Sequence, residues 1–354
     1  MNTIDNSTND EGLLDETYLR LRTTGPEFDG WLSNHGPMAA DALIRLGHGS
    51  DVERWVDQYL QRLEDAPTSR WEIRQDEWLD ALGDPSRLAD WIALFDRQLE
   101  EQPWQAVLIR WWPRLIDGAV ASATHGLIRT GHAVRALITQ PTPARVGELA
   151  QALGYWAARH QRLPGHPRPS GNADPDMALQ AVPAIQTAGD INARLGDLSH
   201  TPSWPGTVAR LHPITSPAEI PDALDAIVDA AVTRYRFWGH GNPIMLVHAA
   251  TAPRAASLVL PALPLSLWIP TFEAAWAASV AITAVYRPVG QPPSTSGADE
   301  RHSTEQVTEH AVTTGDEHAI KFAEVAQDSH LRGNPNALAS SDRANHLIAA
   351  IISR

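Results

Sequence analysis

The sequence contains no cysteine, which excludes disulfides, thiolate metal sites and cysteine nucleophiles. It also contains no Lys/Arg block, and its formal net charge is −14. Nucleic acids and anionic membranes bind concentrated basic patches, so we expect neither as a partner. The N-terminal residues include no basic segment followed by an apolar one, so they do not predict a signal peptide. We expect a cytoplasmic protein whose residues 1–16 are flexible.

No long hydrophobic run is free of interruption. The most apolar stretch, Ala255–Tyr286, contains Pro261, Pro264, Pro270 and Glu273. Proline and a charged residue at these positions favour two buried helices joined by a Pro-rich turn over a membrane span.

No segment shows the period-2 alternation of a strand bounded by hairpin turns. Helical periodicity dominates instead, as in Asp51–Leu63, where the apolar side chains share one stripe. Asp84 followed by Pro85 predicts the N-cap and first position of a helix over 87–99. The other predicted helices cover 104–116, 119–138, 144–159, 220–235, 253–260, 270–286, 317–328 and 340–353. This pattern predicts an all-α fold.

Residues 17–354 are expected to form a single large helical domain with long loops. The stretch 160–176 is rich in proline and is predicted to be a loop. The stretch 288–315 is rich in Ser, Thr, Pro, Gly and acidic residues, which predicts a disordered insertion.

Lys321 is the single lysine of the chain, beside 27 arginines. A GC-rich coding bias could produce this ratio, and one lysine could escape it by chance. A guanidinium stays charged at any working pH, whereas a desolvated amine can lose its proton and act as a base, a nucleophile or a modified ligand. His318 lies three residues earlier and would share a helix face with this lysine. The pair indicates a chemical role.

The chain has 15 histidines, and several lie in apolar surroundings or where a loop enters a helix. His35 precedes an apolar helix, His248 lies inside an apolar run, and His318 opens the predicted helix that carries the lysine. His125 and His132 would share a helix face about 10.5 Å apart along the axis, too far apart for both to bind one ion. Any one of these could be a core histidine bonded to a carbonyl, but together they suggest a metal site.

Imidazole suits Zn, Cu, Fe and Ni, and a histidine-rich shell without thiolate favours iron or zinc over magnesium or calcium. The spacing matches no compact motif such as HExxH. Lys321 could join such a site as a neutral amine or, more easily, as a carbamate formed with carbon dioxide. Glu317 or Glu324 could supply the carboxylate instead, although a solvated helix face is the simpler interpretation of both. His240 could touch a substrate.

Four short blocks carry the histidines of interest: NHGPMA at 34–39, HGLIRTGHA at 125–133, HAAT at 248–251 and HAIK at 318–321. Their order resembles the questin oxidase-like family, and the similarity extends from about Tyr18 to Ala349. The resemblance implies a mostly helical oxidoreductase that opens a ring of an anthraquinone, or of a similar aromatic polyketide, with dioxygen. Part of the family resembles non-heme iron enzymes that use several histidines and a carboxylated lysine, which implies an Fe(II) site here, with another divalent metal as the alternative.

Carried over block by block, the resemblance assigns the metal shell to His35, His125, His248, His318 and Lys321. The chain differs from the family at Arg129 and His132, where His and Tyr are expected. This difference leaves open the substrate and the choice between His125 and His132. His132 or His240 would move protons or orient the substrate. Three tryptophans are candidates to stack on a flat substrate: Trp111, Trp112 and Trp238.

Baeyer–Villiger ring opening would ordinarily use a flavin and NADPH. No G-x-G-x-x-G follows a predicted strand, so we expect no dinucleotide bound by this chain, and a use of NADPH stays open. Two alternatives remain. Lys321 could act as the general base of a metal-free oxygenase or hydrolase, or the chain could be a non-enzymatic helical ligand-binding protein. A homodimer is compatible with each of these functions.

Overall fold

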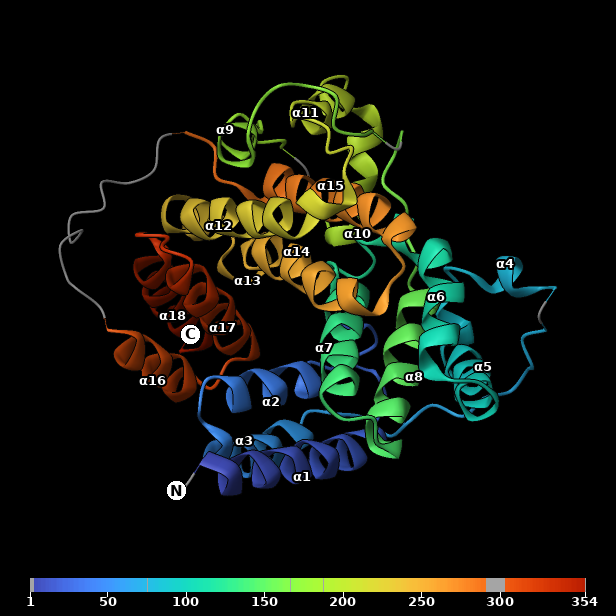
Figure 1. Cartoon of the computed structure of the whole chain (residues 1–354). Helices are drawn as coiled ribbons and strands as arrows, with labels where there is room; N and C mark the ends of the chain where they lie inside the picture. Colours follow the sequence, from blue (N-terminus) through green and yellow to red (C-terminus); the bar gives the residue numbers. More distant parts are fainter. Residues whose placement is uncertain (1–2, 75, 166, 187, 291–302, 354) are drawn as a thin grey trace. The chain divides into compact units, whose positions relative to one another are not determined.

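The computed structural model describes residues 3–74, 76–165, 167–186, 188–290 and 303–353 (Figure 1). The prediction of an all-α fold is confirmed. Among the described residues, paired strands occur only in a short antiparallel ribbon of β1 (Glu27–Phe28) and β2 (Leu32–Ser33), where Phe28 lies opposite Leu32.

Within this helical protein, two compact units can be described. Unit 1 contains residues 1–161 and 261–264, and unit 2 contains residues 162–260 and 265–354. The boundary after Gln161 falls in the Pro-rich stretch 160–176 that the sequence predicts to be a loop.

Helix α8 is the central element of unit 1, since it packs against α1, α5 and α7. Its small and apolar side chains are buried over almost the whole length. Helix α2 packs against α3 and α7 in the same unit. The helices of unit 1 are α1 (Thr3–Arg22), α2 (Gly36–Arg45), α3 (Gly49–Leu60), α4 (Trp78–Ala81), η1 (Pro85–Arg87), α5 (Leu88–Glu101), α6 (Trp104–Leu115), η2 (Ile116–Gly118), α7 (His125–Thr139) and α8 (Pro143–Ala158).

In unit 2, α12 packs against α14, α15, α17 and α18, and α16, α17 and α18 pack against one another (Figure 1). The longer helices of unit 2 are α12 (Ile220–Trp238), α14 (His248–Val259), α15 (Trp268–Tyr286), α16 (Thr304–Thr314), α17 (Glu317–Leu331) and α18 (Ala337–Ile352). The shorter ones are α9 (Pro175–Gln180), α10 (Ile191–Gly196), η3 (Asp197–His200), α11 (Trp204–Ala209), η4 (Pro217–Glu219), η5 (Gly239–Gly241), α13 (Pro243–Leu246) and η7 (Leu265–Leu267). A further short helix is η6 (Leu260–Ala262). Its first residue is the last residue of the segment 162–260 of unit 2, and its other two belong to the segment 261–264 of unit 1.

The predicted start at Asp84 is confirmed. Its carboxylate accepts a hydrogen bond from the backbone N–H of Ser86 at 2.9 Å, and η1 and α5 follow directly. Asn and Asp at an N-cap satisfy N–H groups that the first turn of a helix leaves unpaired.

Helix α7 begins at His125, later than the predicted start at 119. Ser122, Ala123 and Thr124 have φ angles of 45°, 56° and 70°, in the left-handed region that side chains with a Cβ rarely adopt. This turn separates the 3-10 helix η2 from α7 and places His125 at a helix start.

Helix α14 begins at His248, earlier than the predicted start at Pro253. Proline inside a helix leaves the carbonyl four residues before it without a backbone N–H partner. Here the hydroxyl of Ser279 donates to the carbonyl of Ala249 at 2.7 Å, which replaces the missing bond. The helix therefore runs through its proline.

Two segments expected to be irregular contain helices. Helix α1 starts at Thr3, within the stretch 1–16 that was expected to be flexible, and α16 covers Thr304–Thr314, within the predicted insertion 288–315. A capping box of Ser303 and Gln306 begins α16, a local signal that the polar composition obscured. Residues 291–302 of the predicted insertion lie outside the described residues.

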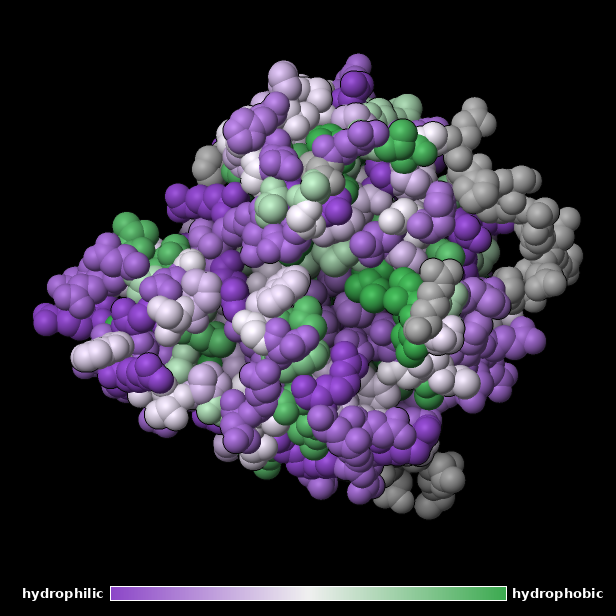
Figure 2. Space-filling model, turned by 180° about the vertical axis from the view of Figure 1, so that it is seen from behind, coloured by the Kyte–Doolittle hydropathy of each residue, from purple (hydrophilic) through white to green (hydrophobic). Residues whose placement is uncertain are grey.

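Two stretches, Pro243–Ala262 and Leu265–Tyr286, are long and apolar enough to cross a membrane by length and composition alone. Of their most apolar windows, 67% and 56% are buried inside the protein, as core helices are. On the face shown in Figure 2, hydrophilic residues predominate and hydrophobic residues form small separate groups. These features agree with the sequence-based expectation of two core helices.

A buried ion pair joins α7 to α8 in unit 1. The guanidinium of Arg129 donates to both carboxylate oxygens of Glu148, at 2.6 and 2.8 Å, and both side chains are buried. We expect Glu148→Leu to lower the free energy of unfolding by about 3–5 kcal/mol, because it leaves a buried charge without its partner. Denaturant titration measures this cost.

The exposed pair of Arg20 and Asp57 provides the control. Asp57→Asn should cost less than about 1 kcal/mol, since exposed ion pairs contribute little. The double variant Arg129→Met/Glu148→Leu should recover part of the loss. Equal costs for Glu148→Leu and Asp57→Asn would contradict the interpretation.

Candidate functional site

In unit 1 the structure brings His35 and His125 together. His35 occupies the N-cap position of α2 and His125 begins α7, and both side chains are buried. Their Nε2 atoms lie 2.6 Å apart, with the ring planes at 73°. Nδ1 of His125 donates to the carbonyl of Ser122, so its Nε2 carries the lone pair. Two imidazole nitrogens this close repel each other unless a proton or a cation lies between them.

His132 has a different partner in unit 1, the carboxylate of Asp41. Nδ1 of His132 lies 2.8 Å from Oδ2 of Asp41, which also accepts hydrogen bonds from Arg135. Burial raises the pKa of the Asp41 carboxyl, but Arg135 and His132 outweigh this and hold it below its ordinary value. With Asp41 ionised, Nδ1 of His132 is the donor and Nε2 is available to accept a proton. The structure thus pairs His125, and not His132, with His35.

In unit 2 the structure brings His248 and His318 together. Their ring centroids are 5.4 Å apart and the ring planes meet at 77°. Nδ1 of His248 donates to the carbonyl of Met245 at 3.1 Å, and Nδ1 of His318 lies 3.2 Å from the carboxylate of Asp316. Each ring therefore presents Nε2 on its other side, the arrangement common among metal-bound histidines.

Asp316 was not predicted as part of the site. It is the N-cap of α17, and its carboxylate also accepts hydrogen bonds from the backbone N–H groups of His318 and Ala319 at 2.8 and 3.3 Å. Burial raises the pKa of Asp316, but His318 and these N–H groups lower it by a larger amount, so the pKa lies below its ordinary value. An aspartate directly before a predicted helix is a recognisable N-cap signal, and here the cap also orients an imidazole.

Lys321 lies one turn after His318 on α17 and is 1% exposed. Its Nζ has no hydrogen-bond partner among the described residues. Burial lowers the pKa of Lys321 to about 8, although Glu317 and Asp316 act in the opposite direction. The neutral amine is therefore the major form only above about pH 8, well below the pH at which an ordinary lysine loses its proton.

The simpler interpretation of Glu317 and Glu324 as a solvated helix face is wrong, since they are only 3% and 6% exposed. The reason is tertiary: α12, α14, α16 and α18 all pack around α17 and cover more than one of its faces. Asp316, Glu317 and His318 can each offer a ligand atom within 4.8 Å of the others. The first turn of α17 therefore holds carboxylates beside its imidazole.

The tryptophans predicted to stack on a substrate are buried and contact protein groups. Trp111 donates to Gln98 at 2.8 Å and meets other rings edge-on, and Trp112 lies edge-on to Trp156 with centroids 5.4 Å apart. The guanidinium of Arg287 lies 4.2 Å from the ring centroid of Trp238. The structure gives no support to a stacking role for these three rings.

His240 lies in η5 and is half-buried. Burial lowers its pKa, and the nearby guanidinium of Arg343 lowers it further. Both effects favour the neutral form of this imidazole.

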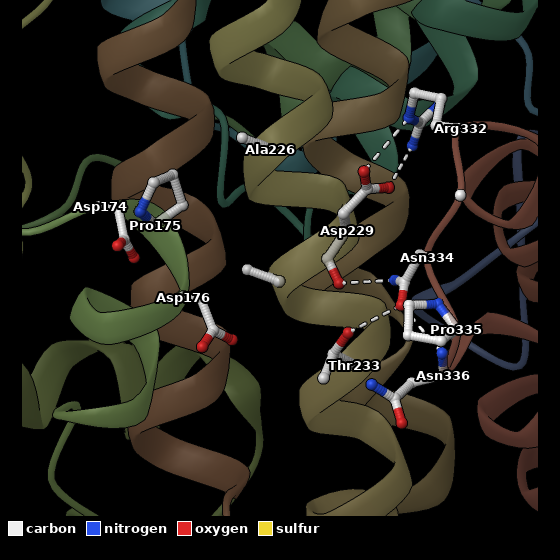
Figure 3. Close-up of a pocket in the computed structure, with 12 residues that line it drawn as sticks. Asp174, Pro175, Asp176, Ala226, Asp229, Thr233, Arg332, Asn334, Pro335 and Asn336 are labelled. Carbon is white, nitrogen blue, oxygen red and sulfur yellow. Dashed lines mark hydrogen bonds and ion pairs between the residues drawn. The ribbon is translucent and has the colours of Figure 1, made fainter.

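The pocket in Figure 3 belongs to unit 2 and has a volume of about 540 Å³. Several of its polar groups bind one another: Arg332 pairs with Asp229, and Asn334 donates to the Asp229 carbonyl at 3.1 Å and accepts from Thr233 at 3.2 Å. None of the predicted site residues lines this pocket.

No protein-family model matches the chain, and no curated protein matches it either. The likeness to the questin oxidase-like family therefore rests on the four sequence blocks and their order.

The lowered pKa of Lys321 predicts a pH dependence of stability. In the unfolded chain this amine has its ordinary pKa of 10.5, against about 8 in the folded protein. Between these values the unfolded chain binds more protons, so the free energy of unfolding should rise as the pH increases from about 8 to 10.5. Below about pH 8 the folded protein carries the whole penalty of the buried charge, on the order of 3 kcal/mol.

We therefore expect Lys321→Met to be more stable than the native chain near pH 7, with a difference that shrinks toward pH 10.5. Urea titrations of metal-free protein in buffers free of carbon dioxide measure it. Lys321→Arg is the matched control, because a guanidinium stays charged and should abolish the rise. Parallel pH profiles for the native chain and the Met variant would contradict the assignment.

Proposed function

We propose that this chain is a non-heme Fe(II)-dependent oxygenase that uses dioxygen to cleave a ring C–C bond of an anthraquinone-like aromatic polyketide. The proposed ligands are His35, His125, His248, His318 and Lys321. The observation that carries the proposal is Lys321, the single lysine of the chain, buried with no hydrogen-bond partner for Nζ among the described residues and one turn from an oriented imidazole.

The orientation of the imidazoles supports a metal site. In His125, His248 and His318, Nδ1 lies against a carbonyl or a carboxylate, and Nε2 of His125 faces Nε2 of His35. Such bonds fix the tautomer and the ring direction of metal-bound histidines. A core histidine has no need for its second nitrogen to face another imidazole, as His125 faces His35.

The setting of Lys321 supports a carbamate. Only a neutral amine adds to carbon dioxide: a C–N bond forms, one proton leaves, and an anionic carboxylate replaces the cation. The pKa of about 8 makes the neutral amine accessible, and Nζ forms no hydrogen bond within the described chain that this reaction would have to break. The product is a hard oxygen donor of the kind that Fe(II) accepts beside imidazole.

Bound iron would supply the activation of dioxygen, which protein side chains alone perform poorly. The side chains of the chain would handle protons. His132, with Nδ1 held by Asp41, can take a proton from a phenolic substrate at Nε2. His240 is a second candidate for proton transfer, and neither needs a dinucleotide. Any reductant, NADPH included, would act without a binding motif on this chain.

Metal content tests this proposal. Protein prepared with Fe(II) and bicarbonate under anaerobic conditions should bind iron, and Lys321→Arg should lose it by at least about tenfold in affinity, because a guanidinium neither forms a stable carbamate nor donates a lone pair. His248→Ala and His35→Ala should each lose iron as well if the five residues act as one shell. His330→Ala, at an exposed position on α17, is the control. Full iron occupancy of the Arg variant would overturn the role of the lysine as a ligand.

The pKa of Lys321 also favours a second function, in which the free amine is the general base of a metal-free oxygenase or hydrolase. This activity would survive exhaustive chelation, whereas that of the iron enzyme would not. A non-enzymatic ligand-binding protein, the remaining alternative, would consume no oxygen with any quinone and would be indifferent to iron in thermal unfolding.

Chemical rescue of Lys321→Ala separates the first two functions. If the lysine acts as a carbamate, formate or acetate should restore iron binding and oxygen consumption, because either supplies a carboxylate in the vacated space. If it acts as a base, methylamine or ethylamine should restore activity with no change in metal content. Rescue by amines alone would reject the carbamate.

A further inference from the structure

A second group of metal-ligating side chains lies in unit 2, outside the residues discussed so far. His310 is on α16, and Asp342 and His346 are on α18. Each offers one ligand atom, and these atoms all lie within 4.8 Å of one another. Because Asp342 and His346 are four residues apart on one helix, they share a face, and His310 meets that face from the neighbouring helix.

The hydrogen bonds of this group orient the two rings. Nδ1 of His346 lies 2.9 Å from the backbone carbonyl oxygen of Asp342 and 3.2 Å from its Oδ2. Nδ1 of His310 lies 3.3 Å from Oδ1 of Asp342. The ring centroids of the histidines are 4.7 Å apart, with planes at 85°. Both imidazoles thus gather around one carboxylate.

Exposure decreases across the group in the way that an accessible ion site requires. The side chains of His346, His310 and Asp342 are 67%, 33% and 19% exposed. The carboxylate is the innermost donor, and the open side leaves an entry path and room for water ligands. Two imidazoles and one carboxylate form a donor set suited to zinc and its neighbours, and far less to magnesium or calcium.

We propose that His310, Asp342 and His346 bind a divalent cation of the zinc class and that this ion fastens α16 to α18. A hydrogen bond already joins these two helices, since the side chain of the buried Asn345 on α18 donates to the carbonyl of Val307 on α16 at 3.0 Å. Only Gly315 and Asp316 separate α16 from α17. An ion that reduces the motion of α16 therefore also reduces the motion of the first turn of α17, where Asp316 orients His318.

Equilibrium dialysis against Zn²⁺ tests this site. His310→Ala and His346→Ala should each bind one equivalent fewer than the native chain, and Asp342→Asn should bind the same zinc at least about tenfold more weakly. These positions are exposed or half-buried, so the variants should fold, which circular dichroism checks. His330→Ala is the matched control for removal of an exposed histidine from unit 2, and it should retain the full zinc content.

A His318→Ala chain separates this site from the proposed iron site. It should still bind the equivalent that His346→Ala removes, whatever happens to iron and oxygenase activity. Zinc should also slow amide exchange in residues 304–314 of the native chain and leave exchange in His346→Ala unchanged. Equal zinc content in the native chain and in His346→Ala, or a zinc equivalent lost with His318→Ala and not with His346→Ala, would overturn the proposal.

Discussion

Hydrogen bonds to Nδ1 determine which nitrogen each buried histidine presents. His125 uses the Ser122 carbonyl in the turn before α7, His248 uses the Met245 carbonyl in the short helix α13, and His318 uses the Asp316 side chain that caps its own helix. In each case a group two or three residues earlier in the chain sets the tautomer of the imidazole. The proposed chemistry depends on these short-range bonds.

The second constraint on the proposed chemistry is the removal of water from Lys321. The helices around α17 exclude water from an amine that has no hydrogen-bond partner in the described chain, and this lowers its pKa although Glu317 and Asp316 favour the charged form. A buried lysine without such a partner lowers the free energy of unfolding at every pH at which its amine stays protonated. A buried amine of this kind is better explained by chemistry than by packing, which an apolar residue would serve better.

The sequence was most informative where a local rule applied. The cap at Asp84 and the apolar stripes located most long helices to within a few residues. The sequence was misleading where a contact between residues far apart in the chain decided the local structure. The hydroxyl of Ser279 lets α14 run through Pro253, and a left-handed turn delays α7, and neither is visible in local periodicity. The pairing of His132 with Asp41 likewise joins residues far apart in the chain.

Composition and periodicity by themselves determined that the protein is helical, lacks thiol chemistry and has one lysine beside a histidine at helical spacing, because these properties depend on residue identity and short spacing. Tertiary structure alone decided that Glu317 and Glu324 are buried, that His125 faces His35, and that His310 meets the face of Asp342 and His346. Burial and pairing arise from packing between helices that are distant in sequence, and no local pattern encodes which faces meet.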